Sequence, residues 1–367
     1  MLIPELPAYL SAMGGADYKG LIIALFTLTA GVSRPFSGKL TDTIGRVPVM
    51  AIGSLVCFVC GFLYPILTSI SGFLFLRLLH GFSTGFKPTA TAAYVADLVP
   101  SGKWGEAMGI HGVCFSTGLA IGPAIGSEIT THFSINYLFY CSSIFALLSI
   151  VILANMKETL PNKQRFKLAL LKINSKEIVE WRVLPAALII LWSYLSYGAI
   201  LTVISDWSKH LGTANKGLFF MVFTVSSLLI RFIAGKFSDQ YGRLVVLKIS
   251  LILLMLALLG IGLASSSFML LLASVVYGVA TGMLSPTATA WTIDLSRPKH
   301  RGKAVATMYI FMEIGIGLGA LVAGAIFLED VSTIPSIFFI CTGITLMALV
   351  YLQFVYKIRP SSRRRHD

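Results

Sequence analysis

The sequence predicts an all-α membrane protein made of two parallel halves, and three observations lead to this fold class. Of the 367 residues, 56% are hydrophobic and only 12% are charged, which gives a mean hydropathy of +0.82. Apolar runs long enough to cross a bilayer as a helix, about 20 residues each, recur along almost the whole chain. Two short motifs also return one half-chain later. A water-facing surface of ordinary composition needs more charge than this, so the chain belongs in lipid.

The apolar runs predict eleven membrane spans. They cover residues 20–36, 49–68, 72–96, 107–130, 136–154, 184–205, 217–234, 245–264, 268–293, 304–327 and 334–356. Hydrocarbon satisfies no backbone polar group, so a span is either a helix or a strand of a closed barrel. Barrel strands would alternate apolar and polar residues, whereas these runs are continuous, which favours helices.

The net charge of +13 raises the question of a nucleic-acid partner, and the distribution of the charge argues against one. Of the 29 Lys and Arg residues, 24 fall on one set of alternate loops, the adjoining helix ends (Arg34 and Arg231 among them) and the carboxy-terminal tail. Only Lys19, Lys209 and Lys216 fall on the opposite loops. This asymmetry places the basic loops and the tail in the cytoplasm. The excess positive charge is therefore explained by the orientation of the chain in the membrane.

An internal repeat organises the chain. The segment Gly38-Lys39-Leu40-Thr41-Asp42-Thr43-Ile44-Gly45-Arg46 returns as Gly235-Lys236-Phe237-Ser238-Asp239-Gln240-Tyr241-Gly242-Arg243, at an offset of 197 residues. Residues 88–92, Pro-Thr-Ala-Thr-Ala, return at 286–290, and Asp97 returns as Asp294. The repeat predicts an amino-terminal bundle over 1–154, a cytoplasmic linker over 155–183, a carboxy-terminal bundle over 184–356 and a basic cytoplasmic tail over 357–367.

The duplicated Gly-x-x-x-Asp-x-x-Gly-Arg motif resembles the loop signature of the major facilitator superfamily. That resemblance implies twelve helices in two six-helix bundles around a central cavity, and it covers essentially the whole chain. Shifting the span at 184–205 back by the repeat offset puts Met1 inside the first helix, which would therefore be truncated. Residues 1–10 then resemble the outer end of that helix, and an in-frame apolar stretch is expected upstream of Met1.

The loop motif has a physical rationale of its own. Gly38 and Gly45 permit tight turns, the Asp42 carboxylate can cap a helix amino terminus, and Arg46 offers a planar fork to a second carboxylate. Asp97 is the expected second carboxylate. The resemblance implies a conformational latch on the cytoplasmic face, formed by Asp42, Arg46 and Asp97 and, pseudo-symmetrically, by Asp239, Arg243 and Asp294. The alternative is ordinary solvated loop charge, and Thr43 and Val47 depart from the basic residues that the family often carries.

A second resemblance concerns the span at 107–130. Its small residues follow the spacing of the family's antiporter signature: Gly109, Gly118, Gly122, Pro123 and Gly126. Three of these glycines share one helical face and allow close backbone approach, and the proline is expected to bend the helix. The resemblance implies an exporter, although Ser127 replaces a usual glycine. Generic small-residue packing is the alternative.

Charged residues inside the membrane are costly unless they are paired or wetted, which makes them candidates for the working site. Arg77 resembles a basic position of the family's fourth helix that is linked to proton coupling in proton-driven exporters. We expect it to set the proton affinity of a cavity carboxylate, with Glu5 as first candidate and Glu313 as second. Lys87 has no match in the family and could serve structural pairing. A buried histidine such as His111 usually makes hydrogen bonds.

These features predict a secondary transporter rather than an enzyme, because no phosphate-binding loop or paired-histidine metalloprotease motif is present. The expected activity is proton-coupled efflux of a drug or metabolite. A symporter that imports a sugar or organic acid is the alternative, and a non-transporting sensor or structural protein is a more distant one. We expect a small molecule and protons as partners, no metal or other cofactor, and a monomer in a cell membrane, the inner membrane of a bacterium.

Overall fold

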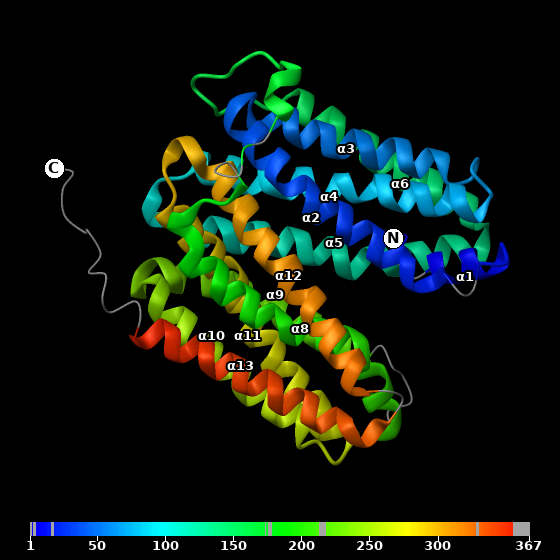
Figure 1. The fold of residues 1–367 in the computed structure, drawn as a ribbon, viewed down its shortest axis with the longest axis vertical. Helices are drawn as coiled ribbons and strands as arrows, with labels where there is room; N and C mark the ends of the chain where they lie inside the picture. The colour runs from blue at the N-terminus through cyan, green and yellow to red at the C-terminus, as the bar shows by residue number, and fades with distance from the viewer. Residues whose placement is uncertain are drawn as a thin grey trace. The chain divides into compact units, whose positions relative to one another are not determined.

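Helices joined by loops and a longer linker make up the chain (Figure 1), a computed structural model in which residues 2, 5–15, 18–172, 174, 178–212, 218–327 and 330–354 are described. No strand occurs among those residues. The all-α prediction is therefore confirmed. The predicted basic tail over 357–367 lies outside the described residues.

Each predicted span coincides with one long helix. The helices of the first half are α1 (Leu6–Ala12), α2 (Lys19–Thr43), α3 (Arg46–Leu63), α4 (Ile70–Leu98), α5 (Trp104–His132) and α6 (Ile135–Ala154). Those of the second half are α8 (Leu184–His210), α9 (Leu218–Tyr241), α10 (Arg243–Gly262), α11 (Ser267–Leu295), α12 (Arg301–Phe327) and α13 (Ile334–Phe354). Short 3₁₀ turns cover Ser101–Lys103, Leu168–Leu171, Trp181–Val183, Pro298–His300 and Val331–Thr333.

Two helices extend well past their predicted ends. α2 continues through Pro35 to Thr43, and α9 continues to Tyr241, so each loop signature begins on a helix rather than in a loop. By length and composition, seven of the described helices can cross a membrane, or eight if the bent pair Leu218–Arg231 and Ile233–Tyr241 counts as one span. The apolar runs read from the sequence also included α2, α4 and α5, of which α2 and α4 carry charged side chains along their length.

The chain divides into two compact units. Unit 1 contains residues 1–101, 114–184 and 292–310, and unit 2 contains residues 102–113, 185–291 and 311–367. The first turns of α5 therefore group with unit 2, and the start of α12 groups with unit 1. The predicted boundaries at 154 and 184 follow the order of the helices along the chain, and as domain limits they stay a prediction.

Glycines bring helices into close contact in unit 1, where α3, α4 and α6 lie side by side and α2 packs on α4 (Figure 1). A Cβ atom added to Gly81 of α4 would lie 2.9 Å from the Thr29 Cβ atom of α2, and one on Gly85 would overlap Ser33. Such close approach of two backbones requires glycine.

The same packing recurs in unit 2. A Cβ atom on Gly278 of α11 would lie 2.8 Å from the Ser226 Cβ atom of α9, and one on Gly282 would meet Ser227. Gly278 and Gly282 stand 197 residues after Gly81 and Gly85. The repeat seen in the loop motif thus extends to the packing of the second and fourth helices of each half.

Candidate conformational latch and membrane-buried charges

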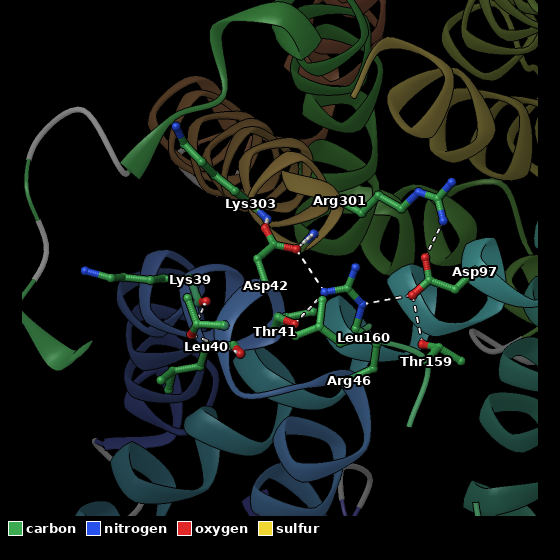
Figure 2. Close-up of polar contacts among 12 residues, drawn as sticks. Lys39, Leu40, Thr41, Asp42, Arg46, Asp97, Thr159, Leu160, Arg301 and Lys303 are labelled. Carbon is green, nitrogen blue, oxygen red and sulfur yellow. Dashed lines mark hydrogen bonds and ion pairs between the residues drawn. The ribbon is translucent and has the colours of Figure 1, made fainter. Parts of the chain in front are cut away.

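Asp42 occupies the last turn of α2 and binds the amino terminus of α12. Its Oδ1 accepts a hydrogen bond from the Gly302 amide at 2.7 Å, and its Oδ2 accepts one from the Lys303 amide at 2.9 Å (Figure 2). The first amides of a helix have no partner within the helix, and they carry partial positive charge. A carboxylate there satisfies two of them at once. The predicted capping role of Asp42 is thus realised on a helix that starts 259 residues further along the chain (301 − 42).

Arg46, at the first position of α3, connects the two predicted carboxylates (Figure 2). Its Nη1 donates to Asp42 at 3.1 Å, and its Nε donates to Asp97 at 3.0 Å. Nη1 also donates to the Thr41 carbonyl. The side chains of Arg46, Asp42 and Asp97 are only 1%, 7% and 13% exposed. These three side chains are thus largely shielded from solvent in this conformation, and their role as a latch stays a prediction.

Asp97 has two further partners at the end of α4. Arg301, the first residue of α12, forms an ion pair with its Oδ1, and the Thr159 hydroxyl donates to its Oδ2 at 2.8 Å (Figure 2). Two arginines therefore share one carboxylate, and each has a planar donor group suited to it.

The linker supplies a carboxylate that the sequence did not point to. Glu158 lies four residues after the end of α6 at Ala154 and caps α3, because its carboxylate accepts from the Arg46 amide at 3.0 Å and the Val47 amide at 3.1 Å. It also accepts from the amides of residues 159 and 160. Gly45 precedes α3 with φ +123°, and a Cβ atom there would overlap the Glu158 carboxylate. The second glycine of the motif is thus required both for the turn and for this cap.

The second copy repeats the arrangement within unit 2. Asp239 accepts hydrogen bonds from the Gly105 and Glu106 amides, both at 2.8 Å, at the amino terminus of α5. Arg243 forms an ion pair with Asp239 and donates to the Ser238 hydroxyl at 2.9 Å. Each signature aspartate therefore caps the fifth helix of the other half of the sequence. Asp294 is exposed and falls in unit 1 whereas Arg243 falls in unit 2, so the predicted pairing of these two stays a prediction.

Arg77 is buried in unit 1 and is held by groups other than carboxylates. Its Nε donates to the Ile22 carbonyl at 3.0 Å, its Nη1 lies 3.4 Å from the Tyr64 hydroxyl, and its guanidinium carbon is 4.6 Å from the centre of the Phe26 ring. A backbone acceptor was among the partners expected for a buried arginine, and the aromatic ring was not. Among the described residues Arg77 forms no ion pair with Glu5, so a link between these two stays a prediction for another conformation.

The other predicted membrane residues are spread over both units. Glu5 and Lys87 are half-buried in unit 1, and His111 and Glu313 are half-buried in unit 2. Lys87 donates to the Ser149 hydroxyl of α6 at 2.7 Å. The described residues contain no group of three or more His, Cys, Asp or Glu side chains that could hold a metal ion.

The antiporter-like helix is continuous from Trp104 to His132. Close packing occurs at Gly109, where a Cβ atom would lie 2.8 Å from the Arg231 carbonyl of α9. A Cβ atom on Gly118 would meet no atom within 4 Å among the described residues. Gly122 is buried, and the Pro123 side chain lies outside the described part of the structure. The exporter assignment carried by this motif stays a prediction.

One pair of arginines was wrongly counted with the helix ends. Arg34 is fully buried within α2, donates to the Thr89 hydroxyl at 3.1 Å and stacks on Tyr309 with its guanidinium carbon 4.3 Å from the ring centre. Its counterpart 197 residues later, Arg231, lies within α9 and donates to Ser227 at 3.3 Å. The error arose because both helices run past their apolar spans. The shared repeat offset was the signal that could have identified the pair.

Comparison with known proteins agrees with this architecture. The family model described as Major Facilitator Superfamily matches the chain twice, over residues 1–192 and 186–367. The chain is 25% identical over 354 residues to an uncharacterised MFS-type transporter of Methanocaldococcus jannaschii, with 92% of this chain and 89% of that protein covered. It is also 25% identical over 362 residues to the quinolone resistance protein NorA of Staphylococcus aureus, with 95% and 90% covered.

Two solved structures share the fold. The human organic anion transporter MFSD10 (TETRAN) aligns with a TM-score of 0.77 at 21% identity, covering 94% of this chain and 88% of that one. The proton:xylose symporter XylE, bound to 6-bromo-6-deoxy-D-glucose, aligns with a TM-score of 0.80 at 16% identity, covering 96% and 90%.

Two helical bundles related by a parallel repeat, with a duplicated aspartate–arginine motif that caps helices, define a multi-pass membrane transporter. The chain belongs to the Major Facilitator Superfamily.

Proposed function

We propose that the protein is a secondary active transporter that exports a small molecule in exchange for protons by alternating access. The observation that carries this proposal is the latch itself. Asp42 holds the first amides of α12 while Arg46 joins Asp42 to Asp97, and all three side chains are buried. Three charged groups buried in one bonded set stabilise one conformation over others.

The latch gives alternating access a physical basis. The bonds of Asp42 to α12 exist only while the amino end of that helix stays beside α2. Opening the cytoplasmic side would break them and expose the freed amides and carboxylate to water. The latch would therefore favour the conformation that is closed toward the cytoplasm, and substrate or proton binding would have to offset it.

Export in exchange for protons rests on two further observations. One relative, whose alignment covers 95% of this chain, is a quinolone resistance protein. That name fits the removal of a compound from the cell. Arg77 is buried in unit 1, and a permanently charged guanidinium lowers the pKa of any carboxyl group that approaches it. Movement of Arg77 relative to a carboxylate such as Glu5 or Glu313 would make that acid take up and release a proton in each cycle.

The same proposal predicts the membrane in which the protein works. An exporter driven by protons works in an energised membrane, which in a bacterium is the inner membrane, with the basic loops in the cytoplasm. Each unit carries its own copy of the latch motif, so a single chain is sufficient for the cycle.

The experiment is transport into everted membrane vesicles, with a chemically broad panel that includes cationic dyes, fluoroquinolones and organic anions. We expect at least one compound to accumulate when the vesicle interior is made acidic and to leak out when a protonophore is added. The control is a matched preparation carrying Asp42→Asn together with Asp239→Asn. Accumulation that is equal in vesicles lacking the protein contradicts the proposal, and accumulation only in right-side-out vesicles would indicate an import symporter.

A further inference from the structure

A cavity of about 320 Å³, lined by both apolar and polar side chains, lies within unit 1, separate from the latch. Three neighbouring helices form its wall: Gly53, Ser54 and Cys57 of α3, Ser83, Thr84, Lys87 and Pro88 of α4, and Ser142, Phe145, Ala146 and Ser149 of α6. The volume falls in the range of small-molecule sites.

Lys87 is the charged group of this cavity. Its Nζ donates to the Ser149 hydroxyl at 2.7 Å, and the Ser149 hydroxyl also lies 3.4 Å from that of Ser54. Within the described part of the chain, no carboxylate lies within ion-pair distance of Lys87. An ammonium group at membrane depth needs an anion, water or several acceptors, and the cavity supplies one hydroxyl.

Other polar groups on the wall add to this donor set. The hydroxyls of Thr84 and Ser142 line the cavity and make no hydrogen bond within the described residues. Cys57 lies on the wall with its Sγ atom 3.4 Å from His80 Nε2, and His80 Nδ1 lies 3.3 Å from the Tyr64 hydroxyl. Hydroxyl groups and an ammonium group together are donors suited to the two oxygens of a carboxylate.

The second half of the chain lacks this site, although it repeats the fold. At the offset of 197 residues Cys57 corresponds to Leu254, and Lys87 corresponds to Leu284, or to Ser285 at the offset of 198 that aligns the two Pro-Thr-Ala-Thr-Ala segments. Packing three helices in this way therefore does not by itself place a lysine in a cavity.

The cavity borders an exposed apolar surface of α6. Phe145 lines it and is 56% exposed, and its neighbours Ile144 and Leu148 on α6 are exposed as well. At a rise of about 1.5 Å per residue, Ser149 lies about 7 Å and Lys87 about 16 Å from the cytoplasmic ends of their helices. The hydrocarbon core is about 30 Å thick, so the cavity lies at membrane depth, with Ser149 nearer the cytoplasmic side than Lys87.

We propose that this cavity binds the carboxylate end of a single-chain lipophilic acid that enters from the cytoplasmic leaflet. The carboxylate pairs with Lys87 Nζ and accepts from the hydroxyls on the wall, and the aliphatic chain leaves past Phe145 into the bilayer. A phospholipid suits the site less well, because its phosphate is held at the membrane surface, several ångströms above Lys87. A free acid has no second chain or glycerol to prevent deeper insertion.

The test is photoaffinity labelling of the purified full chain in lipid nanodiscs. The probe is hexadecanoic acid with a diazirine next to its carboxyl end, and labelled peptides are mapped by mass spectrometry. We expect labels on residues 53–57, 83–88 and 142–149. Lys87→Met should reduce labelling about tenfold, as loss of a charge-assisted bond predicts, while Lys87→Arg should retain it. The methyl ester of the probe should label the wild-type protein as weakly as the acid labels Lys87→Met.

A matched control is Lys209→Met, which removes an exposed lysine at the end of α8 and should leave labelling unchanged. A second readout needs no change at Lys87. With the other four cysteines replaced, hexadecanoic acid should slow the alkylation of Cys57 by a maleimide, and its methyl ester should not.

Three results would overturn the proposal: equal labelling of Lys87→Met and wild type, equal labelling by acid and ester, or labels that map outside the three wall segments. Displacement of the probe by phosphatidylglycerol at a lower concentration than by hexadecanoic acid would assign the site to a phospholipid instead. Binding is measured without transport, so failure here is distinct from failure of the proposed export.

Discussion

At the residue scale, Asp42 shows how one side chain can link segments that are far apart in sequence. Its two oxygens accept from two amides of α12 and from Arg46 at the start of α3. An asparagine at this position would retain one acceptor oxygen and present an NH₂ group where the second oxygen now accepts. The substitution therefore preserves the shape of the side chain but leaves one amide donor of α12 facing another donor.

We therefore expect Asp42→Asn to slow transport more than it weakens substrate binding. Loss of the charge-assisted bonds would shift the conformational equilibrium by about 1–3 kcal/mol, whereas substrate contacts are unchanged. The measurement pairs initial transport rates in proteoliposomes with equilibrium substrate binding in detergent. Asp330→Asn serves as control, because Asp330 is exposed and its side chain bonds, among the described residues, to Ser332 in its own turn. Normal turnover in Asp42→Asn, at normal expression, would refute the latch.

Arg77 belongs to the same scale, since its guanidinium is held by one carbonyl, one hydroxyl and one ring. If it tunes a cavity acid, Glu5→Gln should abolish accumulation against a gradient while sparing substrate binding and downhill exchange. Arg77→Ala should do the same through the perturbed acid. Parallel assays of proton-driven accumulation and of exchange between equal substrate pools would separate coupling from binding. Normal pumping by both variants would place coupling elsewhere.

The sequence predicted part of the latch at this scale. Asp42, Arg46 and Asp97 were identified because a duplicated motif marks them. Glu158 and Arg301 were missed, since their contacts with Arg46 and Asp97 join residues 112 and 204 positions apart. A glutamate in a polar linker and an arginine in a basic loop have no local pattern that distinguishes them from solvated charges.

At the element scale, α3 begins with a cap that comes from the linker. Glu158 accepts from the first two amides of α3, and Gly45 leaves the space that its carboxylate fills. Capping by a side chain from outside the helix both stabilises α3 and fixes the start of the linker against the amino terminus of α3.

Glu158→Ala should accordingly lower stability by about 1–2 kcal/mol, the usual effect of losing a helix cap. The measurement is thermal unfolding of the purified protein in detergent, followed by scanning fluorimetry. Glu128→Ala is a suitable comparison, because Glu128 is exposed and, among the described residues, pairs with His132 in the same helix. An unfolding temperature equal to that of the wild type would mean that water replaces the cap without loss.

The contact of α2 with α4 is the other element-scale feature that a single change can test. Gly81→Val should reduce the yield of folded protein, because its Cβ atom would overlap the Phe26 carbonyl and approach Thr29. Gly31→Ala should be tolerated, since a Cβ atom there meets nothing within 4 Å of the described residues, and alanine favours helix by up to about 1 kcal/mol. Size-exclusion profiles of the two variants, at matched expression, provide the comparison. Equal monodisperse yields would contradict the packing argument.

Helix positions were largely predictable at this scale, and their ends were not. Long apolar runs identify the spans directly, because a helix that crosses the hydrocarbon core must be apolar along most of its length. α2 and α9 continue beyond the runs as polar helix, where burial of Arg34 and capping by Asp42 and Asp239 replace lipid as the stabilising environment.

At the scale of the whole molecule, the repeat predicted the architecture, because two copies of one motif at a fixed offset imply two copies of one bundle. The lysine cavity of unit 1 could not be predicted, since it depends on where three helices place small side chains around Lys87. Substrate choice has the same origin in residues dispersed over many helices. Transport direction and coupling therefore have to be measured.

The most direct test of proton-coupled export measures the movement of protons rather than that of the substrate. Proteoliposomes containing the purified protein and a lumenal pH dye are loaded with a transported compound and diluted into buffer without it. An antiporter must bring protons in as the compound leaves, so we expect the lumen to become acidic at a rate that depends on the protein. Alkalinisation of the lumen would show symport, and outflow of the compound with no change in lumenal pH would contradict proton coupling.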